Sequence, residues 1–299
     1  HSPLAEPGIS VTEGDRLLAV GGISLDEFTT PGELLVHQAG QFVSLTIFDD
    51  KKTKKTKDKK DSNRRQVIVK TLNQEQGVRY RDWVMKNTKI VTSITDGKIG
   101  YLHLPDMGAY GISEFHRSYL SQVDREGLIV DVRYNAGGMV SPLILEKLSH
   151  RHLGYDVPRW GSPESYPYHT LRGHLIVIAN QFTGSDGDMF TTSFRQLKLG
   201  TLVGKRTWGG VIGIDGRYQL VDGTTTTQPQ YSIWFHHAGW SVENYGVDPD
   251  IVVEDTPQSF VNDEDPMLDK TIRRMLRLLK EEPVKSLSYS VSPRRFLPD

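Results

Sequence analysis

The pattern of hydrophobic and polar positions changes character about a quarter of the way along the chain. Before that point the apolar residues form short runs that are separated by glycines and polar turn residues. Three of these runs, at 16–20, 42–48 and 66–70, have the length and composition of β-strands, and a helical stretch lies between the first two. We therefore predict a mostly β domain over residues 1–73.

After residue 73 the pattern predicts strands that alternate with helices. Candidate strands lie at 98–104, 128–132, 175–179 and 202–203, and apolar residues at helical spacing lie between them. This alternation is typical of an α/β domain with a parallel or mixed sheet covered by helices. We predict such a domain over 74–258, followed by a C-terminal segment over 259–299. Its apolar spacing predicts a closing helix at 265–279.

Composition narrows the classes of function. The chain has 36 lysines and arginines against 37 acidic residues, which argues against binding nucleic acid or an anionic membrane over its whole surface. It has no cysteine, which excludes disulfides, cysteine zinc sites and a cysteine nucleophile. No apolar run approaches the roughly 20 residues that span a bilayer, and the start lacks the apolar core of a signal peptide. We expect a soluble chain and, because it opens without Met, a processed or excised fragment.

The strongest local charge is a lysine-rich run at 51–65, in which seven of the first ten residues are lysines. One interpretation is a tail that binds nucleic acid or acidic lipid. We favour a solvated loop, stretched by self-repulsion between two strands of a hairpin, because blocks of like charge are commonly disordered. We therefore expect no nucleic-acid or membrane partner.

A glycine turn that follows the predicted strand at 128–132 is the first candidate for chemistry. In an open α/β sheet ligands bind where strands lead into helices, and the unpaired N–H groups of the new helix favour negative charge there. Gly137 and Gly138 keep side chains out of this turn. The Gly138 N–H can then donate to a developing oxyanion, although a helix cap would use the same glycines.

A second turn holds Ser185 between Gly184 and Asp186. The placement resembles a nucleophile elbow, although Thr183 stands where Gly-x-Ser-x-Gly has its first glycine. An N-capping serine is the alternative. Taken together, the two turns predict a serine nucleophile beside an oxyanion hole formed by the N–H groups of Gly138 and Asp186. Loss of one such donor costs roughly 3 kcal/mol of transition-state stabilisation.

Both turns belong to a series of motifs that resembles the tail-specific and tricorn serine peptidases. The motifs are Gly-Lys-Ile-Gly-Tyr-Leu at 97–102, Asp-Val-Arg-Tyr-Asn-Ala-Gly-Gly at 131–138, Thr-Gly-Ser-Asp-Gly at 183–187, Val-Gly-Lys-Arg-Thr-Trp-Gly-Gly at 203–210 and Glu-Asn-Tyr-Gly-Val-Asp-Pro-Asp at 243–250. The runs at 2–9 and 14–18 look like the PDZ domain that precedes the catalytic domain in these enzymes. The resemblance implies an N-terminally truncated PDZ-like domain and an α/β catalytic domain with a crotonase/ClpP-like ββα core.

The two branches of this family activate the serine differently. Tail-specific peptidases use a lysine in a Thr-Phe-Gly-Lys-Gly-like run, and Gly210 stands where that lysine would be. Lys205 is not at the matching place, and we interpret it as a solvated lysine. The tricorn branch, which this chain resembles in Asp186 and Glu243, uses a histidine that a glutamate orients through a second serine. The resemblance therefore implies Ser185 as nucleophile and Glu243 as orienting carboxylate.

The histidine of that branch lies N-terminal to the PDZ domain, so the resemblance places the general base in N-terminal domains outside this chain. The alternative within the chain is His236 or His237, which follow a predicted strand at 231–235. His150 and His152 have a spacing that suits a metal but lack further ligands. We expect surface histidines there, and neither a metal nor a cofactor.

The resemblance also implies a substrate class. Tricorn peptidases cleave short peptides after basic or hydrophobic residues, as cytoplasmic homo-oligomers that are hexamers in the family. Asp156 looks like the aspartate that reaches a basic side chain from a neighbouring subunit, and Gly137 is a further substrate-binding candidate; a surface aspartate is the alternative. Two other classes compete: a non-catalytic PDZ-type peptide-binding module, and a crotonase-like acyl-CoA enzyme, which needs no serine nucleophile.

Overall fold

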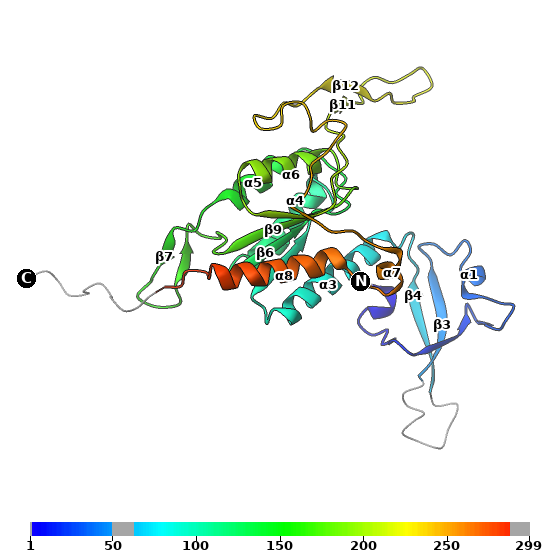
Figure 1. Ribbon diagram of the computed structural model, residues 1–299. Helices are drawn as coiled ribbons and strands as arrows, with labels where there is room; N and C mark the ends of the chain where they lie inside the picture. The colour runs from blue at the N-terminus through cyan, green and yellow to red at the C-terminus, as the bar shows by residue number, and fades with distance from the viewer. Residues whose placement is uncertain (1, 50–62, 288–299) are drawn as a thin grey trace, which may run out of the picture. The chain divides into compact units, whose positions relative to one another are not determined.

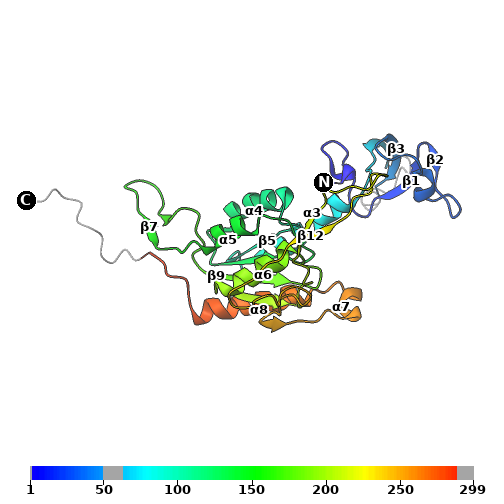
Figure 2. The ribbon, with the colours of Figure 1, turned by 90° about the horizontal axis from the view of Figure 1, so that it is seen from above.

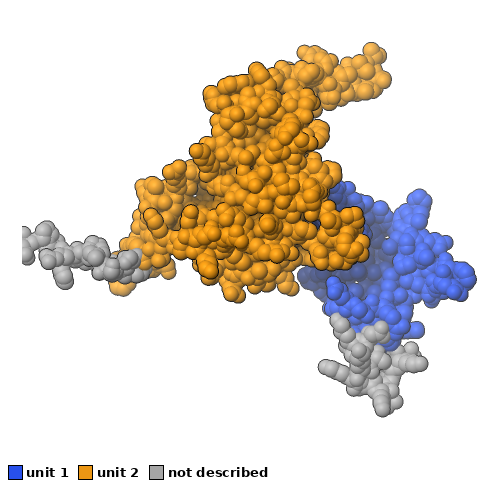
Figure 3. Space-filling view, viewed as in Figure 1, with its two compact units in different colours: residues 1–85 blue, residues 86–299 orange. Residues whose placement is uncertain are grey.

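Two main sheets organise the chain, one in each of two units that divide between Met85 and Lys86 (Figure 3). The computed structural model describes residues 2–49 and 63–287. Most of the lysine-rich run at 51–65 lies outside the described residues. Arg64 and Arg65, which we assigned to that loop, instead begin a strand.

The first unit holds a four-stranded antiparallel sheet in the order β2-β1-β3-β4, which confirms the mostly β prediction. Its elements are η1 (Pro3–Ala5), β1 (Arg16–Val20), β2 (Ile23–Ser24), α1 (Pro31–Leu34), β3 (Phe42–Phe48) and β4 (Arg64–Lys70). Alternate residues of β3 point into a core formed by Val20, Val43, Leu45, Ile47 and Val69. Phe48 pairs with Arg64, so the lysine-rich run connects two antiparallel neighbours.

The second unit holds a five-stranded parallel sheet in the order β13-β10-β9-β6-β5. Its strands are β5 (Ile99–His103), β6 (Gly127–Asp131), β9 (His174–Ala179), β10 (Thr201–Gly204) and β13 (Ile251–Val252), and its helices are α4 (Ala109–Gln122), α5 (Ser141–Ser149), α6 (Asp186–Gln196), α7 (Pro257–Val261) and α8 (Pro266–Glu281). Two short hairpins, β7 (Gly154–Asp156) with β8 (Glu164–Tyr166) and β11 (Gly213–Asp215) with β12 (Gln228–Tyr231), leave this sheet. The predicted parallel sheet with covering helices is confirmed.

The strands follow one another across the sheet in the order of the sequence, and this decides where the helices lie. Each crossover steps in the same direction, and right-handed crossovers then place α4, α5 and α6 on one face. Figures 1 and 2 show these three helices on one side of the sheet and α8 on the other. The N-termini of α5 and α6 therefore meet the carboxyl ends of β6 and β9 at one edge of the sheet.

The closing helix packs tightly, as its apolar spacing predicts. Met267, Ile272 and Met275 of α8 are buried. A Cβ atom added to Gly127 would lie 2.7 Å from the Met275 sulfur, so α8 packs closely against β6 at this glycine. The sheet beneath is apolar on both faces, with every residue of β5 and β6 buried.

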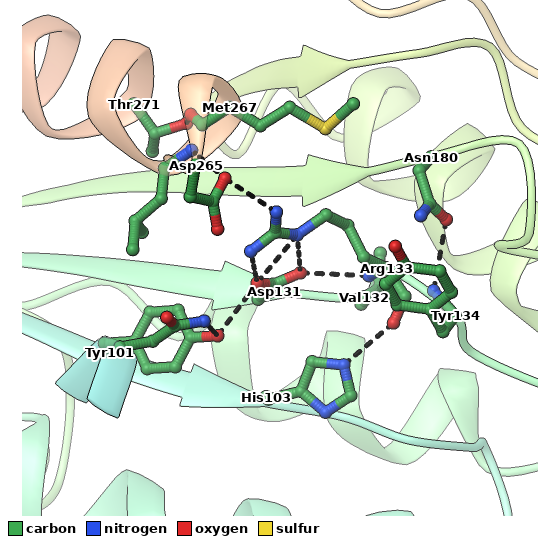
Figure 4. A network of polar contacts seen from close by, with 12 residues as sticks. Tyr101, His103, Asp131, Val132, Arg133, Tyr134, Asn180, Asp265, Met267 and Thr271 are labelled. Atoms are coloured by element: carbon green, nitrogen blue, oxygen red, sulfur yellow. Dashed lines mark hydrogen bonds and ion pairs between the residues drawn. The ribbon is translucent and has the colours of Figure 1, made fainter. Parts of the chain in front are cut away.

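A buried polar network fastens the start of α8 to the sheet (Figure 4). Arg133 donates to Asp131 at 2.7 Å and to Asp265, the N-cap of α8, at 2.9 Å. The Tyr101 hydroxyl donates to Asp131 at 2.8 Å, and His103 Nε2 donates to the Arg133 carbonyl at 2.8 Å. Burial raises the pKa of Asp131, but the charge and hydrogen bonds of Arg133 outweigh it and hold that pKa below its usual value.

Two expectations about elements were wrong. The strand predicted at 231–235 ends at Tyr231, because β12 pairs with the short β11 and the register stops at Gly213 opposite Tyr231. Phe235 then forms only a single bridge, to Gly239, across a tight turn. The long helix α3 (Gln76–Ile94) was not predicted, since only Asn87 and Val91 in it are buried and its apolar stripe is weak.

Among the described residues, none of the helices has the length and apolar character needed to cross a bilayer.

Candidate active site

Ser185 lies in a strained turn, and its hydroxyl does not cap the helix that follows. It follows β9 and stands at the N-cap of α6, with φ 56° and ψ −120°, a conformation that non-glycine residues rarely adopt. Its side chain makes no capping hydrogen bond to the helix. The side chain is half-buried. The strained turn therefore leaves the Ser185 hydroxyl free of a capping hydrogen bond to α6.

The turn that holds Gly137 lies directly against Ser185. A Cβ atom added to Gly137, where φ is +81°, would lie 2.5 Å from Ser185 Cβ and 3.1 Å from Ser185 Oγ. Asn135 joins the two turns: its carbonyl accepts from the Gly184 N–H at 3.0 Å, and its Oδ1 accepts from the Gly137 N–H at 2.9 Å. The two turns that the sequence singled out thus form one site.

The Gly138 loop is fixed from its other side by Met107. The Met107 N–H donates to the Gly137 carbonyl at 2.8 Å, and the Met107 carbonyl accepts from Met139 at 2.7 Å and from Val140 at 3.0 Å. A Cβ atom on Gly138 would lie 2.0 Å from the Met107 carbonyl oxygen, so the position needs glycine. Among the hydrogen bonds of the described residues, the N–H of Gly138 donates none.

Asp186 contributes more than its amide. Within the part of the chain that the structure describes, its N–H also donates no hydrogen bond. Its carboxylate, only 2% exposed, accepts from the Ser141 N–H at 2.9 Å and from the Ser141 hydroxyl at 2.5 Å. Ser141 is the first residue of α5. The start of α6 is therefore bonded to the start of α5.

A second buried carboxylate, Asp188, holds the run at 207–212 behind Ser185. Its Oδ1 accepts from the Gly209 N–H at 2.9 Å, while its Oδ2 is buried and has no hydrogen-bond partner among the described residues. Burial raises the pKa of Asp188, although the Thr207 hydroxyl and the amides of Gly209, Ser185 and Gly210 act in the opposite direction. The carboxylate sits at the helix start because N–H groups converge there.

The same run leads from Ser185 to Glu243. The Trp208 N–H donates to the Thr183 carbonyl at 2.9 Å, two residues before Ser185. At the other end, Glu243 Oε2 accepts from the N–H groups of Val211 at 2.7 Å and Ile212 at 2.9 Å. Glu243 and Ser185 share no direct hydrogen bond among the described residues.

His237, one of the two histidines offered as alternatives, contacts the far end of α6. His237 Nδ1 is 3.1 Å from Gln196 Oε1 at the C-terminal end of α6, and the helix has 11 residues, so about 15 Å separates that end from Ser185. No histidine in the described ranges hydrogen-bonds Ser185. His152 packs edge-on against Tyr155, and the described residues contain no group of three metal-ligand side chains.

Two further candidates have surroundings that the sequence did not indicate. Lys205 is not a solvated lysine: its ammonium pairs with Glu254 at 2.9 Å, and its side chain is 20% exposed. Asp156 ends β7 on a hairpin that extends away from the sheet (Figure 1), and a hydrogen bond to it raises the pKa of Tyr168. An exposed carboxylate at the end of such a hairpin is able to meet another molecule.

Several residues that build the site escaped sequence reasoning. Ser141, Asn135 and Asp188 act through contacts with segments about 45, 49 and 21 residues away, and such pairings leave no local pattern. The only local signal was the neighbourhood of Asn135 and Asp188 to the two glycine turns.

Comparison with known proteins identifies the family of the chain. The sequence profile of peptidase family S41 matches residues 98–253, and that of the tricorn protease PDZ domain matches residues 1–74. Tricorn protease homolog 1 of Streptomyces coelicolor is 46% identical over 96% of this chain and 26% of its own length. The tricorn protease of Thermoplasma acidophilum is 46% identical over 93% of this chain and 25% of its own.

A crystal structure of the tricorn protease superposes with a TM-score of 0.85 and 40% identity, covering 93% of this chain and 26% of that one. The chain therefore spans about a quarter of the length of these relatives. Because the S41 profile covers more than half of the chain and contains both glycine turns, the chain belongs to peptidase family S41, with a tricorn-type PDZ domain before its catalytic domain.

Proposed function

We propose that this chain carries the nucleophilic half of a serine peptidase of the tricorn type, which hydrolyses short peptides through an acyl-enzyme. The observation that carries the proposal is the conformation of Ser185: a strained turn, a hydroxyl that caps nothing, and Gly137 packed against its Cβ. Helix N-termini that only need a cap do not require this strain.

In the proposed reaction, Ser185 Oγ attacks the peptide carbonyl carbon while its proton passes to a general base. The carbonyl oxygen becomes an oxyanion and accepts from the N–H groups of Gly138 and Asp186. The C–N bond then breaks, the amine leaves with the proton, and an ester on Ser185 remains. Water adds to this ester by the same route, which releases the carboxylic acid and restores the hydroxyl.

The base in this proposal is a histidine from residues outside positions 1–299, as the family resemblance implies, and no described histidine hydrogen-bonds Ser185. Glu243 is the carboxylate that orients it. Its Oε2 is fixed by two backbone amides, so the carboxylate is held in one orientation. Its role resembles that of the aspartate in a Ser-His-Asp triad, with one more relay.

Three finer points belong to the same proposal. The repeated strand, turn and helix of the second unit corresponds to the ββα core of crotonases and ClpP. Asp156 meets basic substrate side chains across a homo-oligomer, since its hairpin leads away from its own sheet. The whole protein trims oligopeptides in the cytoplasm. These three points rest on the resemblance of the chain to its tricorn relatives.

A fluorophosphonate probe tests the proposal, because it reacts only with an activated serine. We expect labelling at Ser185 in this chain extended at its N-terminus to the length of its relatives, loss of labelling in Ser185→Ala, and much slower labelling of residues 1–299 alone. Labelling at another residue, or none in the extended chain, contradicts the proposal and favours a peptide-binding module or a crotonase-like enzyme. Equal rates with and without the extension contradict an external base.

A further inference from the structure

The structure assigns to the buried carboxylate of Asp186 a positioning role: through Ser141 it fixes the loop that carries the Gly138 N–H, so that one residue controls both oxyanion donors. This inference rests on the proposed function of Ser185 as a nucleophile. It concerns the side chain of Asp186, which acts independently of the amide that the residue contributes itself.

The contact between Asp186 and Ser141 lies at the starts of both helices, where it can position the Gly138 loop. Asp186 and Ser141 are the first residues of α6 and α5, and each is 2% exposed. Both oxygens of the carboxylate are used, one by the Ser141 N–H at 2.9 Å and one by its hydroxyl at 2.5 Å. Burying a carboxylate is costly unless hydrogen bonds compensate it, so this pair holds one geometry.

Electrostatics explain why a carboxylate is needed rather than a neutral group. Two helices begin side by side here, and each start carries partial positive charge from its unpaired N–H groups. Placed together, these two ends repel each other. The carboxylate of Asp186 lies at both starts and attracts each, so α5 and α6 are held close where the two turns must meet.

The Asp186 carboxylate restrains Gly138 because the connection between Gly138 and Ser141 is short. Only Met139 and Val140 separate Gly138 from Ser141, and both of their amides bond the Met107 carbonyl. The peptide of Gly138 is therefore clamped between Met107 on one side and Asp186 on the other. Two consecutive glycines have great backbone freedom, so losing one clamp lets the N–H drift from its direction.

The size of the effect can be bounded. Complete loss of one oxyanion donor costs about 10²- to 10³-fold in kcat. Misplacement of a group by about 1 Å costs up to about 10²-fold. Ser141→Ala removes one of two bonds, and we expect kcat to fall by about 3- to 10-fold. Asp186→Ala removes both bonds and the charge, and we expect a loss of about 10- to 100-fold.

The experiment compares Ser141→Ala, Asp186→Ala and Asp186→Asn with a matched control, Ser149→Ala, in the N-terminally extended chain. Ser149 lies in the last turn of the same helix, and its hydroxyl donates to the Glu146 carbonyl. The assays are kcat and KM on a fluorogenic peptide, and inhibition by a peptide aldehyde, whose adduct with the serine places an oxyanion in the hole. Thermal unfolding reports the fold.

We expect kcat and aldehyde affinity to fall together in the three site variants, with KM within about twofold of the parent and Ser149→Ala unchanged. Asp186→Asn retains a hydrogen-bonded pair but no charge, so it should lie between the parent and Asp186→Ala. Unchanged kcat in folded Ser141→Ala and Asp186→Asn overturns the inference, as does a rise in KM alone. These two variants decide the matter if Asp186→Ala does not fold.

Hydrogen exchange separates this inference from the proposed function. The amides of Met139 and Val140 are bonded to Met107 whether or not Ser185 is reactive. We expect them to exchange faster in Ser141→Ala and Asp186→Ala than in the parent and in Ser149→Ala. If Ser185 proves unreactive in the parent, the proposed function fails while this result still tests the clamp. Unchanged exchange at both amides overturns it.

Discussion

Replacing Gly137 by alanine should make Ser185 much less reactive, because the added methyl group contacts the serine side chain directly. The new Cβ would lie 2.5 Å from Ser185 Cβ and 3.1 Å from its Oγ, so the serine or the loop must move. The left-handed φ of +81° costs alanine about 1–2 kcal/mol, and forcing an extra methyl into a packed site costs about 1–3 kcal/mol. We expect Gly137→Ala to lose about 2–5 kcal/mol of unfolding free energy, and labelling of Ser185 to slow by about 100-fold.

The assay pairs urea unfolding with fluorophosphonate labelling. Gly77→Ala is the control, because Gly77 is an exposed position in α3 with nothing within 4 Å of an added Cβ, and alanine should stabilise it by about 0.5–1 kcal/mol. Ser185→Gly removes the clashing Cβ, so in the double variant most of the overpacking cost should disappear, a coupling of about 1–3 kcal/mol. Additive costs, or labelling of folded Gly137→Ala at the parent rate, refute the predicted contact.

Four other changes test the surroundings of the site. Arg133→Met should cost about 3–5 kcal/mol in urea unfolding, because it leaves the charge of Asp131 buried, and Asp131→Asn in the same chain should recover most of it; no recovery would contradict a paired charge. Glu243→Gln keeps an acceptor for its two backbone amides but should slow labelling of the extended chain by about 10²- to 10⁴-fold, with little change in the chain alone. Asp188→Asn should gain stability relative to the parent as pH rises: the folded pKa of Asp188 is above its ordinary 3.8, so the contribution of the protonated acid is complete below that value and is lost as pH rises through the folded pKa. Thermal unfolding at a series of pH values measures this gap, and a gap that does not change with pH would contradict the raised pKa. Asp156→Ala should weaken cleavage after Arg or Lys while cleavage after apolar residues persists, as seen with matched fluorogenic peptides; an unchanged preference removes Asp156 from the site.

The elements that bear Ser185 were predictable because their signals are local. The buried strands β6 and β9 contain the apolar runs Leu-Ile-Val and Leu-Ile-Val-Ile-Ala, and the glycines that follow them mark the turns. The closing helix α8 was predictable because its apolar residues recur at helical spacing. The helix α3 was not, since most of its surface is polar and only two of its residues are buried.

The contacts that shape the site were not predictable for the same reason. Asp186 is bonded to Ser141, which is 45 positions away, and no propensity or periodicity links the two. Lys205 was interpreted as solvated because it does not stand at the place of the family's lysine, yet the fold brings Glu254 to it. Strand 231–235 was overpredicted since aromatic and β-branched residues favour strands, while a strand also needs a partner, and β11 is only three residues long.

Ser185 is held from three sides by hydrogen bonds that belong to this chain. Asn135 bonds the amide just before it, Asp186 fastens the start of its helix to α5, and Asp188 fastens that helix to the run at 207–212. None of these contacts involves a histidine. The geometry of Ser185 is therefore set by contacts among the described residues of this chain.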